Sequence, residues 1–178
     1  MRKFLLLVLA FALIAAACSG SNQDQTTYEV TVDYDKRIED SVKEGDYYNR
    51  GSLQLFNSDN FLSSPRSSIN TIELQLVNFE DTIHTSQVLK EFNKRCLRPA
   101  TIEEFLAFGI VYSDFRPEFP IAALGSVVVG LVDIDFRDYV PVLKNDERGR
   151  YLELAPFSHR LWPSNYRFLV VSFCGTSN

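Results

Sequence analysis

Alternation between apolar and polar positions, together with continuous apolar runs, predicts the strands of this chain. From Thr27 to Tyr34 the two kinds of residue alternate with a period of two, as in a strand that is buried on one face. Gly125 and Gly130 predict a bend or bulge in a later strand, and Pro141 predicts an edge strand or the end of a ladder. The last apolar run is nearly continuous, which favours a central position in the sheet. In chain order, strands are predicted over residues 27–34, 69–79, 121–132, 139–143, 151–157 and 166–173.

Apolar residues at helical spacing predict three helices, and the best-defined helix start lies near the middle of the chain. Pro99 cannot continue a preceding helix, because its φ is fixed and it has no N–H. Thr101 and Glu104 form a capping-box pattern, in which a hydroxyl and a carboxylate accept backbone N–H groups. Glu103 and Glu104 are interpreted as first-turn acids that complement the helix dipole, not as catalytic groups. The helices are predicted over 36–44, from Thr82 or Thr85 to Arg95, and from Thr101 to near Tyr112.

The order of these elements predicts the fold class. A strand, a helix, a strand and two helices precede several strands that are joined by short connections. This order is typical of an α+β domain, in which two or three helices pack on a mostly antiparallel sheet. The polar segment 46–68 predicts a long surface loop, and loops of this length are often functional or disordered. A single domain is expected over 28–178, because roughly 150 residues suffice for one core.

The first 18 residues carry the pattern of a bacterial lipoprotein signal. Arg2 and Lys3 precede an apolar run of about 14 residues, shorter than the roughly 20 that cross a membrane. The Ala-Ala-Ala tripeptide before Cys18 resembles a lipobox, which implies cleavage there and lipidation of the cysteine. Residues 1–17 are therefore expected to be the signal peptide and 18–27 a polar tether, with the domain lipid-anchored at the extracytoplasmic face of a cell membrane. An ordinary cleaved signal and an uncleaved anchor are the alternatives.

The charge of the chain argues against one class of partner. Removal of residues 1–17 takes away Arg2 and Lys3 and changes the formal charge from −5 to −7. An acidic balance without a basic run or a basic–aromatic stripe argues against nucleic acid. The sequence has no glycine-rich phosphate loop, and we expect no cofactor.

The three cysteines bear on whether the domain contains a disulfide bond or a metal site. If Cys18 carries lipid, Cys96 and Cys174 are left as an isolated pair, and in an exported protein such a pair favours a disulfide bond. Two buried free thiols are the alternative. His84 and His159 are the only histidines, and neither stands at a zinc-finger spacing from a cysteine, so no metal site is predicted there.

Two other groups of side chains are candidates for chemistry or recognition. Asp133 and Asp135 share one face of a predicted strand, with Asp138 nearby, and are weak candidates for Ca²⁺ binding or acid–base catalysis. A solvated loop face is the simpler interpretation. Aromatic and imidazole side chains in or beside loops form a candidate binding surface, with a place in the core or at its rim as the simpler alternative. These residues are Tyr47, Tyr48, His159, Trp162 and Tyr166.

Several segments resemble a group of small bacterial proteins to which no activity is attached. The matching segments are 45–48, 98–104, 119–126, 140–143 and 167–171. More distantly, the layout resembles the C-type lectin fold in its formylglycine-generating branch, through Arg98 to Glu104 and the Tyr166-Arg167-Phe168 strand. This resemblance implies a bridge from the first long helix to the last strand, which agrees with the Cys96–Cys174 pairing. It implies neither the enzyme activity nor calcium binding, because the late cysteine pair and the lectin calcium motifs are absent from the sequence.

Three classes of function follow as hypotheses. The first is a lipid-anchored binding module that presents its loops to an unknown protein or glycan partner. The second is an enzyme that acts on cell-envelope material through Asp133, Asp135 or Glu103. The third is a structural envelope lipoprotein without a specific ligand. A deep pocket with converging polar groups would favour the enzyme, and an aromatic-rimmed surface would favour binding.

Overall fold

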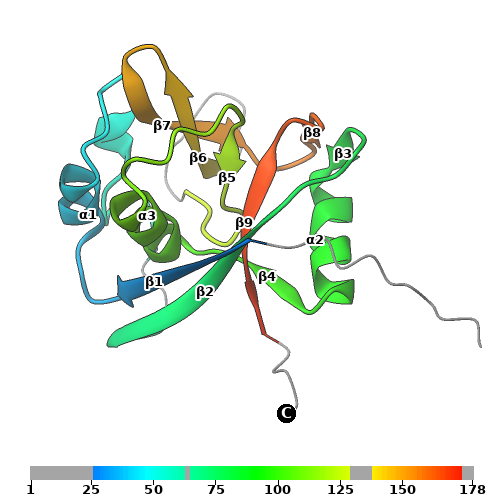
Figure 1. Cartoon of the computed structure of the whole chain (residues 1–178), viewed down its shortest axis with the longest axis horizontal. Coiled ribbons are helices and arrows are strands. Elements are labelled where there is room, and N and C mark those ends of the chain that lie inside the picture. Colours follow the sequence, from blue (N-terminus) through cyan, green and yellow to red (C-terminus); the bar gives the residue numbers. More distant parts are fainter. Residues whose placement is uncertain (1–25, 63–64, 129–137, 174–178) are drawn as a thin grey trace, which may run out of the picture.

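The structure, a computed structural model, describes residues 26–62, 65–128 and 138–173 (Figure 1). The helices are α1 (Ile38–Glu44), α2 (Thr85–Lys94) and α3 (Ile102–Val111), with a 3-10 turn η1 (Leu53–Leu55). The strands are β1 (Thr27–Asp33), β2 (Ile69–Val77), β3 (Ile83–His84), β4 (Leu97–Pro99), β5 (Ile121–Ala122), β6 (Tyr139–Asp146), β7 (Gly149–Pro156), β8 (Leu161–Trp162) and β9 (Arg167–Ser172). Helices packed on a mostly antiparallel sheet confirm the predicted α+β class.

The main sheet has the strand order β1-β2-β9-β5-β6-β7, and β4 also pairs with β9. All of these pairs are antiparallel except β5 with β9. A small second sheet joins β3 to β8. The last long strand is thus central, as its continuous apolar run predicted, because β2 covers one edge of β9 while β4 and β5 share the other.

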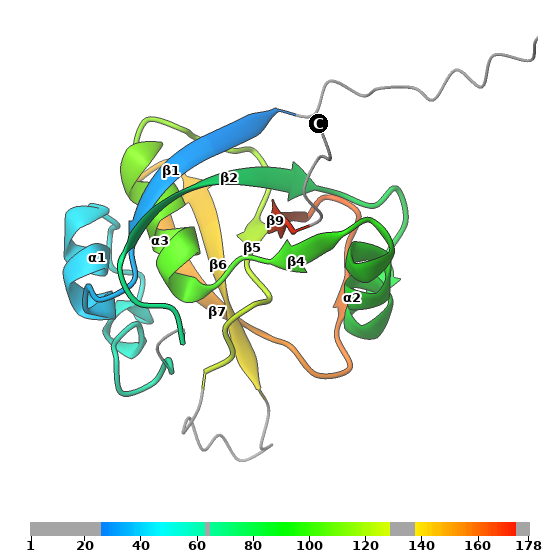
Figure 2. The ribbon, with the colours of Figure 1, turned by 90° about the horizontal axis from the view of Figure 1, so that it is seen from below.

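Alternate residues of β9 supply two separate cores, one on each face of the sheet. Leu169 and Val171 belong to the core beneath α1 and α3, which we call the first core. Phe168 and Val170 belong to the second core, beneath α2. Successive side chains of a strand point to opposite faces, so a strand that is buried on both faces needs no polar alternation. Figures 1 and 2 show the consequence, with α1 and α3 on one side of β9 and α2 on the other.

The start of α3 is the predicted capping box. Thr101 has extended backbone angles at the N-cap, and the Glu104 carboxylate accepts the Thr101 N–H at 2.9 Å. The start of α2 differs from the prediction, because His84 is the N-cap and Thr85 is the first helical residue. The Thr85 hydroxyl does not cap the helix, because it accepts the Trp162 indole N–H at 2.8 Å and donates to the Phe157 carbonyl at 2.8 Å.

The strands agree with the prediction at Pro141 and differ from it in two places. Pro141 marks the end of the β5–β6 ladder, one of its two predicted positions, and β6 is not an edge strand because it lies between β5 and β7. The predicted strand 121–132 is a strand only at β5 within its described part, with a further bridge at Val128. Strands β3, β4 and β8 were not predicted, since two or three residues are too few to show a pattern.

Arg150 joins the carboxyl-terminal ends of two helices, where carbonyl groups lack intrahelical partners. Its guanidinium donates to the Gly45 carbonyl at 2.8 Å and to the Gly109 carbonyl at 2.6 Å. The guanidinium carbon also lies 5.1 Å from the ring centroid of Tyr47. A Cβ at Gly109 would lie 1.8 Å from the Tyr47 hydroxyl oxygen, so this helix position must be glycine unless the ring moves. Tyr47 is therefore a core residue that packs between the ends of α1 and α3 and Arg150 of β7.

The predicted signal peptide and nearly all of the tether lie outside the described residues. Within the described ranges, no helix is both long enough and apolar enough to span a membrane. The lipid anchor therefore stays a prediction from the sequence.

Candidate ligand-binding groove

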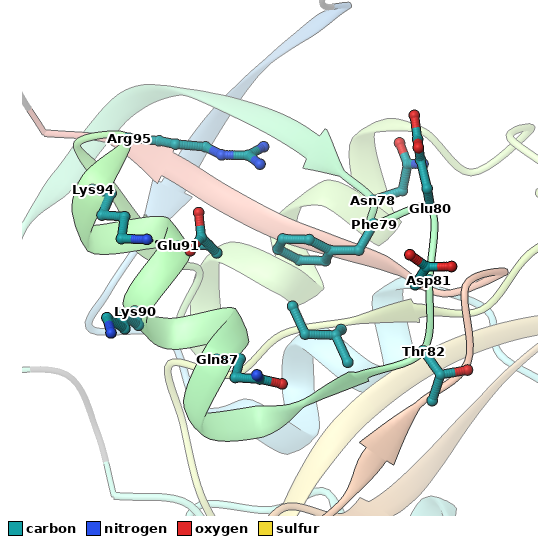
Figure 3. A pocket seen from close by; sticks show the side chains of 11 residues that line it. Asn78, Phe79, Glu80, Asp81, Thr82, Gln87, Lys90, Glu91, Lys94 and Arg95 are labelled. Carbon is teal, nitrogen blue, oxygen red and sulfur yellow. Dashed lines mark hydrogen bonds and ion pairs between the residues drawn. The ribbon is translucent and has the colours of Figure 1, made fainter.

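A groove of about 680 Å³ lies between α2 and the segment 78–83, which leads from β2 to β3 (Figure 3). We call it the α2 groove. Its volume falls within the range of small-molecule sites, roughly 300–1,000 Å³. The helix wall consists of Gln87, Lys90, Glu91, Lys94 and Arg95. These residues recur every three or four positions, so they form one face of the helix.

The local sequence explains why these polar side chains face outward. Val88 and Phe92 of α2 are buried in the second core, which turns the opposite face of the helix towards solvent. The far end of segment 78–83 is held in place because Ile83 pairs with Trp162 in the small β3–β8 sheet. The two walls of the groove are thus positioned by the second core and by the second sheet.

The floor of the groove is an aromatic side chain that is anchored in the core. The Phe79 ring centroid lies 6.3 Å from that of Phe92 and 5.8 Å from that of Phe168. On the groove side, the guanidinium carbon of Arg95 lies 5.5 Å from the Phe79 ring centroid, within the range of a cation–π contact. Figure 3 shows Phe79 reaching from its segment towards the helix wall. This floor is apolar and fixed in position.

The charges around the groove are separated by element. Glu80 and Asp81 lie on segment 78–83, whereas Lys90 lies on α2 and Arg95 follows directly after its last residue. Among the described residues, none of these four side chains has an opposite charge within 4.0 Å. All four are exposed, so the lack of ion pairs costs little in stability. The groove therefore presents two acidic and two basic groups that face solvent.

One ion pair does form on the helix wall. Lys94 Nζ donates to Glu91 Oε1 at 2.6 Å, and this hydrogen bond lowers the pKa of the Glu91 carboxyl. The pair is neutral as a unit, so it adds little to the charge that a ligand would encounter.

A smaller pocket of about 260 Å³ lies at the amino-terminal end of α2. It brings together His84 and His159, the only two histidines of the chain, from segments far apart in the sequence. His159 is exposed and has a φ of 55°, in the left-handed region. Among the described residues, no group of three or more His, Cys, Asp or Glu side chains could hold a metal ion. Within the described part of the chain, the two imidazoles therefore have no further His, Cys, Asp or Glu ligand of the kind that a metal centre needs.

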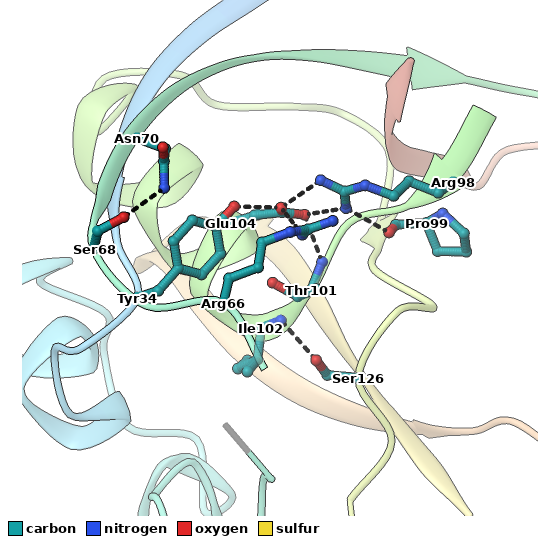
Figure 4. A network of polar contacts seen from close by, with 10 residues as sticks. All are labelled: Tyr34, Arg66, Ser68, Asn70, Arg98, Pro99, Thr101, Ile102, Glu104 and Ser126. Carbon is teal, nitrogen blue, oxygen red and sulfur yellow. Dashed lines mark hydrogen bonds and ion pairs between the residues drawn. The ribbon is translucent and has the colours of Figure 1, made fainter. Parts of the chain in front are cut away.

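The helix start at the centre of the sequence carries a buried polar network (Figure 4). Arg98 binds Glu104 in a bidentate manner, at 2.8 Å to Oε2 and 2.7 Å to Oε1. The Tyr34 hydroxyl donates to Oε1 at 2.6 Å, and Arg66 Nη1 donates to the same atom at 3.0 Å. With the Thr101 N–H, the fully buried Glu104 carboxylate accepts five hydrogen bonds. We call this set of residues the Glu104 network.

Titration of the Glu104 network follows from its hydrogen bonds. Burial raises the pKa of the Glu104 carboxyl, but the hydrogen bonds from Arg98 and Tyr34 outweigh burial, so the pKa lies below its ordinary value. Burial and the hydrogen bond to Glu104 raise the pKa of Tyr34 to about 12. The carboxylate is therefore ionised near neutral pH with its acceptor sites occupied, which is the state of a structural group and not of a catalytic base.

The candidate binding surface predicted from the aromatic residues is not assembled as a surface. Trp162 is fully buried, and Tyr47 and Tyr166 are each 7% exposed, so these three rings belong to the cores. Tyr48 is partly exposed, and its hydroxyl donates to Asp146. Of the five residues, only His159 is well exposed, in the smaller pocket. The simpler alternative, a place in the core, describes most of the set.

Of the candidate carboxylates, the structure describes only Asp138 and Glu103. Asp133 and Asp135 lie outside the described residues, as do Cys18 and Cys174. Asp138 accepts a hydrogen bond from the Ser158 hydroxyl at 3.0 Å. Glu103 is buried and lines a cavity of about 90 Å³, which is too small for most substrates.

The sequence carried a signal for the α2 groove that the prediction did not use. Polar residues recur at positions 87, 90, 91, 94 and 95, and Phe79 stands directly before two acids. Such a stripe is usually a solvated helix face, and only the packing of segment 78–83 beside it makes a groove.

Comparison with known proteins adds no further information, since no family model, curated protein or solved structure matches the chain. The resemblance to a group of small bacterial proteins and the more distant C-type lectin resemblance therefore stay predictions.

Proposed function

We propose that this protein is a lipid-anchored binding module on the extracytoplasmic face of a membrane, and that it holds its ligand in the α2 groove. One observation carries the binding part of the proposal. A groove of about 680 Å³ has a fixed aromatic floor and four charged side chains, Glu80, Asp81, Lys90 and Arg95, that make no ion pair with described residues. Its volume suits a small ligand or a short segment of a larger protein or glycan.

The binding proposal is tested by what the full chain retains when it is purified from native envelope extract. Small molecules that co-purify with wild type would be identified by mass spectrometry after denaturation, and compared with those from Lys90→Glu. Lys43→Glu on α1 is the matched control, because it makes the same charge change at an exposed lysine away from the groove. We expect a molecule that is retained by wild type and by Lys43→Glu but is lost from Lys90→Glu. Equal recovery of every molecule from all three proteins would show that the groove is not the site.

The anchor is supported by the sequence, through the short apolar run and the Ala-Ala-Ala-Cys18 pattern. We expect Cys18→Ser to lose lipidation and to leave the membrane fraction, because the acyl chains hold such a protein at the bilayer. Globomycin, which inhibits lipoprotein signal peptidase, should cause a longer precursor to accumulate. A Cys18→Ser protein that is processed and fractionates as wild type does would contradict the anchor.

We further propose a disulfide bond between Cys96 and Cys174. Support comes from the backbone near Cys96, whose carbonyl accepts the Phe173 N–H at 3.0 Å, while Leu97 pairs with Ser172. Closing a loop of roughly 80 residues would stabilise the fold by about 4–5 kcal/mol in the chain-entropy model. Intact mass after alkylation without reductant should show both thiols protected. Alkylation of both cysteines in the exported protein would contradict the bond.

A further inference from the structure

We infer that the α2 groove takes a small zwitterionic ligand, such as an amino acid or a short peptide with free termini. In this arrangement the ligand's ammonium group lies by Glu80 and Asp81, and its carboxylate lies by Lys90 and Arg95. This inference rests on the proposed function and adds to it the chemical class of the ligand.

The first step of the argument is that the two walls carry opposite net charges. Figure 3 shows Glu80 and Asp81 on the segment beside the helix, whereas Lys90 and Lys94 lie on α2 and Arg95 follows directly after it. Glu91 on the helix wall offsets only one of these three positive charges, so a field runs across the groove from the helix to the segment. A ligand that carries both charges can align with this field and gain at both ends.

The second step is that the walls do not neutralise each other. Among the described residues the only ion pair of the groove is Lys94 with Glu91, within the helix wall itself. The acids of segment 78–83 lie more than 4.0 Å from every described Lys and Arg nitrogen. A purely anionic ligand at the helix wall would lie near these acids, and a purely cationic ligand would lie near the bases. The groove therefore disfavours a ligand with one kind of charge.

The third step is that the space between the two walls is apolar at its base. Phe79 and the partly buried Ile83 line the groove between the charged groups. Phe79 is held by Phe92 and Phe168, so it offers a fixed apolar contact and does not collapse into the groove. A ligand with an apolar body and a charge at each end matches this order of charge, apolar contact and opposite charge.

The test uses the full chain, purified in detergent, and probes of defined charge. The probes are phenylalanine and the tripeptide Ala-Phe-Ala, each with free termini, with an acetylated amino terminus, or with an amidated carboxyl terminus. Binding is followed by NMR from the backbone amide shifts of residues 78–95, at probe concentrations up to about 10 mM, which covers a Kd near 1 mM. We expect the free-termini probes to shift these amides, and each blocked form to bind at least tenfold more weakly.

Charge swaps in the groove sharpen the test. Asp81→Lys and Lys90→Glu should each weaken binding of the free-termini probe about tenfold or more. The quadruple variant E80K/D81K/K90E/R95E reverses the charge of both walls without changing the net charge, so a zwitterion can bind it in the reverse direction. We therefore expect the quadruple variant to regain most of the affinity. Asp59→Lys and Lys43→Glu, which make the same charge changes at exposed positions elsewhere, should bind as wild type does.

The outcomes separate this inference from the proposed function. Probes that shift the groove amides equally with free and blocked termini would overturn the zwitterionic ligand and leave the groove as a binding site. A quadruple variant that binds no better than the single swaps would have the same meaning. If no probe shifts these amides, the zwitterionic ligand is overturned, and recovery of a Lys90-dependent molecule from envelope extract then decides whether the groove binds anything.

Discussion

Glu104 and the acids of the α2 groove, Glu80 and Asp81, show two ways in which this domain treats a carboxylate. Glu104 is fully buried and accepts five hydrogen bonds from two guanidinium groups, a hydroxyl and a backbone N–H. Glu80 and Asp81 are exposed and have no ion pair among the described residues. A buried charge must be matched within the fold, whereas an exposed charge can stay unmatched at little cost in stability. The comparison teaches that the denser cluster of charges is structural, and that the looser one is available to a ligand.

The largest expected effect comes from removing the buried carboxylate. Glu104→Ala leaves Arg98, Arg66 and Tyr34 without their common partner, and breaking a buried ion pair on one side typically costs about 3–5 kcal/mol. We expect the free energy of unfolding, measured by urea denaturation, to fall by this amount. Glu104→Gln keeps the volume and some acceptor capacity, so it should lose less. If the urea midpoint of Glu104→Ala equals that of wild type, the buried carboxylate contributes no more to stability than the exposed acids of the groove do.

The next effect comes from Arg150, a buried charge that is matched by carbonyl groups instead of a carboxylate. Arg150→Met removes the donors to the Gly45 and Gly109 carbonyls, and each buried acceptor left unsatisfied costs about 1–3 kcal/mol. We expect the free energy of unfolding to fall by about 2–6 kcal/mol, the sum for the two carbonyl groups. Arg150→Lys should recover only part of this loss, because an ammonium group lacks the planar fork that reaches both carbonyls. Full recovery with lysine would show that the charge alone matters.

The Glu104 network should also make the stability of the fold depend on pH. The pKa of Glu104 in the folded chain lies below its ordinary value of 4.5, so folding is stabilised by this group above pH 4.5 and loses that contribution as the pH falls below it. Tyr34 acts in the opposite direction, because its raised pKa of about 12 stabilises the fold up to pH 10 and the contribution is lost towards pH 12. The thermal midpoint, followed against pH, should show both declines. In Glu104→Gln the fall of the thermal midpoint at acid pH should be smaller than in wild type. If it is unchanged, other groups cause the loss of stability in acid.

The smallest effect on stability is expected in the α2 groove. Asp81→Lys and Lys90→Glu change exposed side chains without ion pairs, so the urea midpoint should stay close to that of wild type. The same variants are expected to change ligand binding. A large loss of stability in either variant would mean that the groove charges support the fold, and it would remove the contrast with Glu104.

Much of the fold could be predicted from the sequence because its signals are local. The capping box of Thr101 and Glu104 involves groups within one helical turn, and it starts α3 as predicted. The alternation from Thr27 onward and the continuous run of β9 follow from the period of two in a strand and from burial on one or both faces. Element type in these segments depends on neighbouring residues, so no knowledge of the partner strands was needed.

The candidate sites depended on contacts between distant segments, and only the tertiary structure decided them. From its neighbours in the sequence alone, Glu104 is interpreted as an acid that complements the dipole of its helix. It is the centre of a network only because Tyr34 and Arg66, which are 70 and 38 residues away in the sequence, bind it in the fold. The α2 groove likewise requires the β3–β8 pairing that holds segment 78–83 beside the helix. The sequence by itself determined the helices and the main strands, since local sterics and hydrophobic periodicity act over a few residues. The export pattern stays a prediction from the sequence. Long-range packing decides which charges are buried with a partner and which face solvent. No local pattern in the sequence encodes that packing.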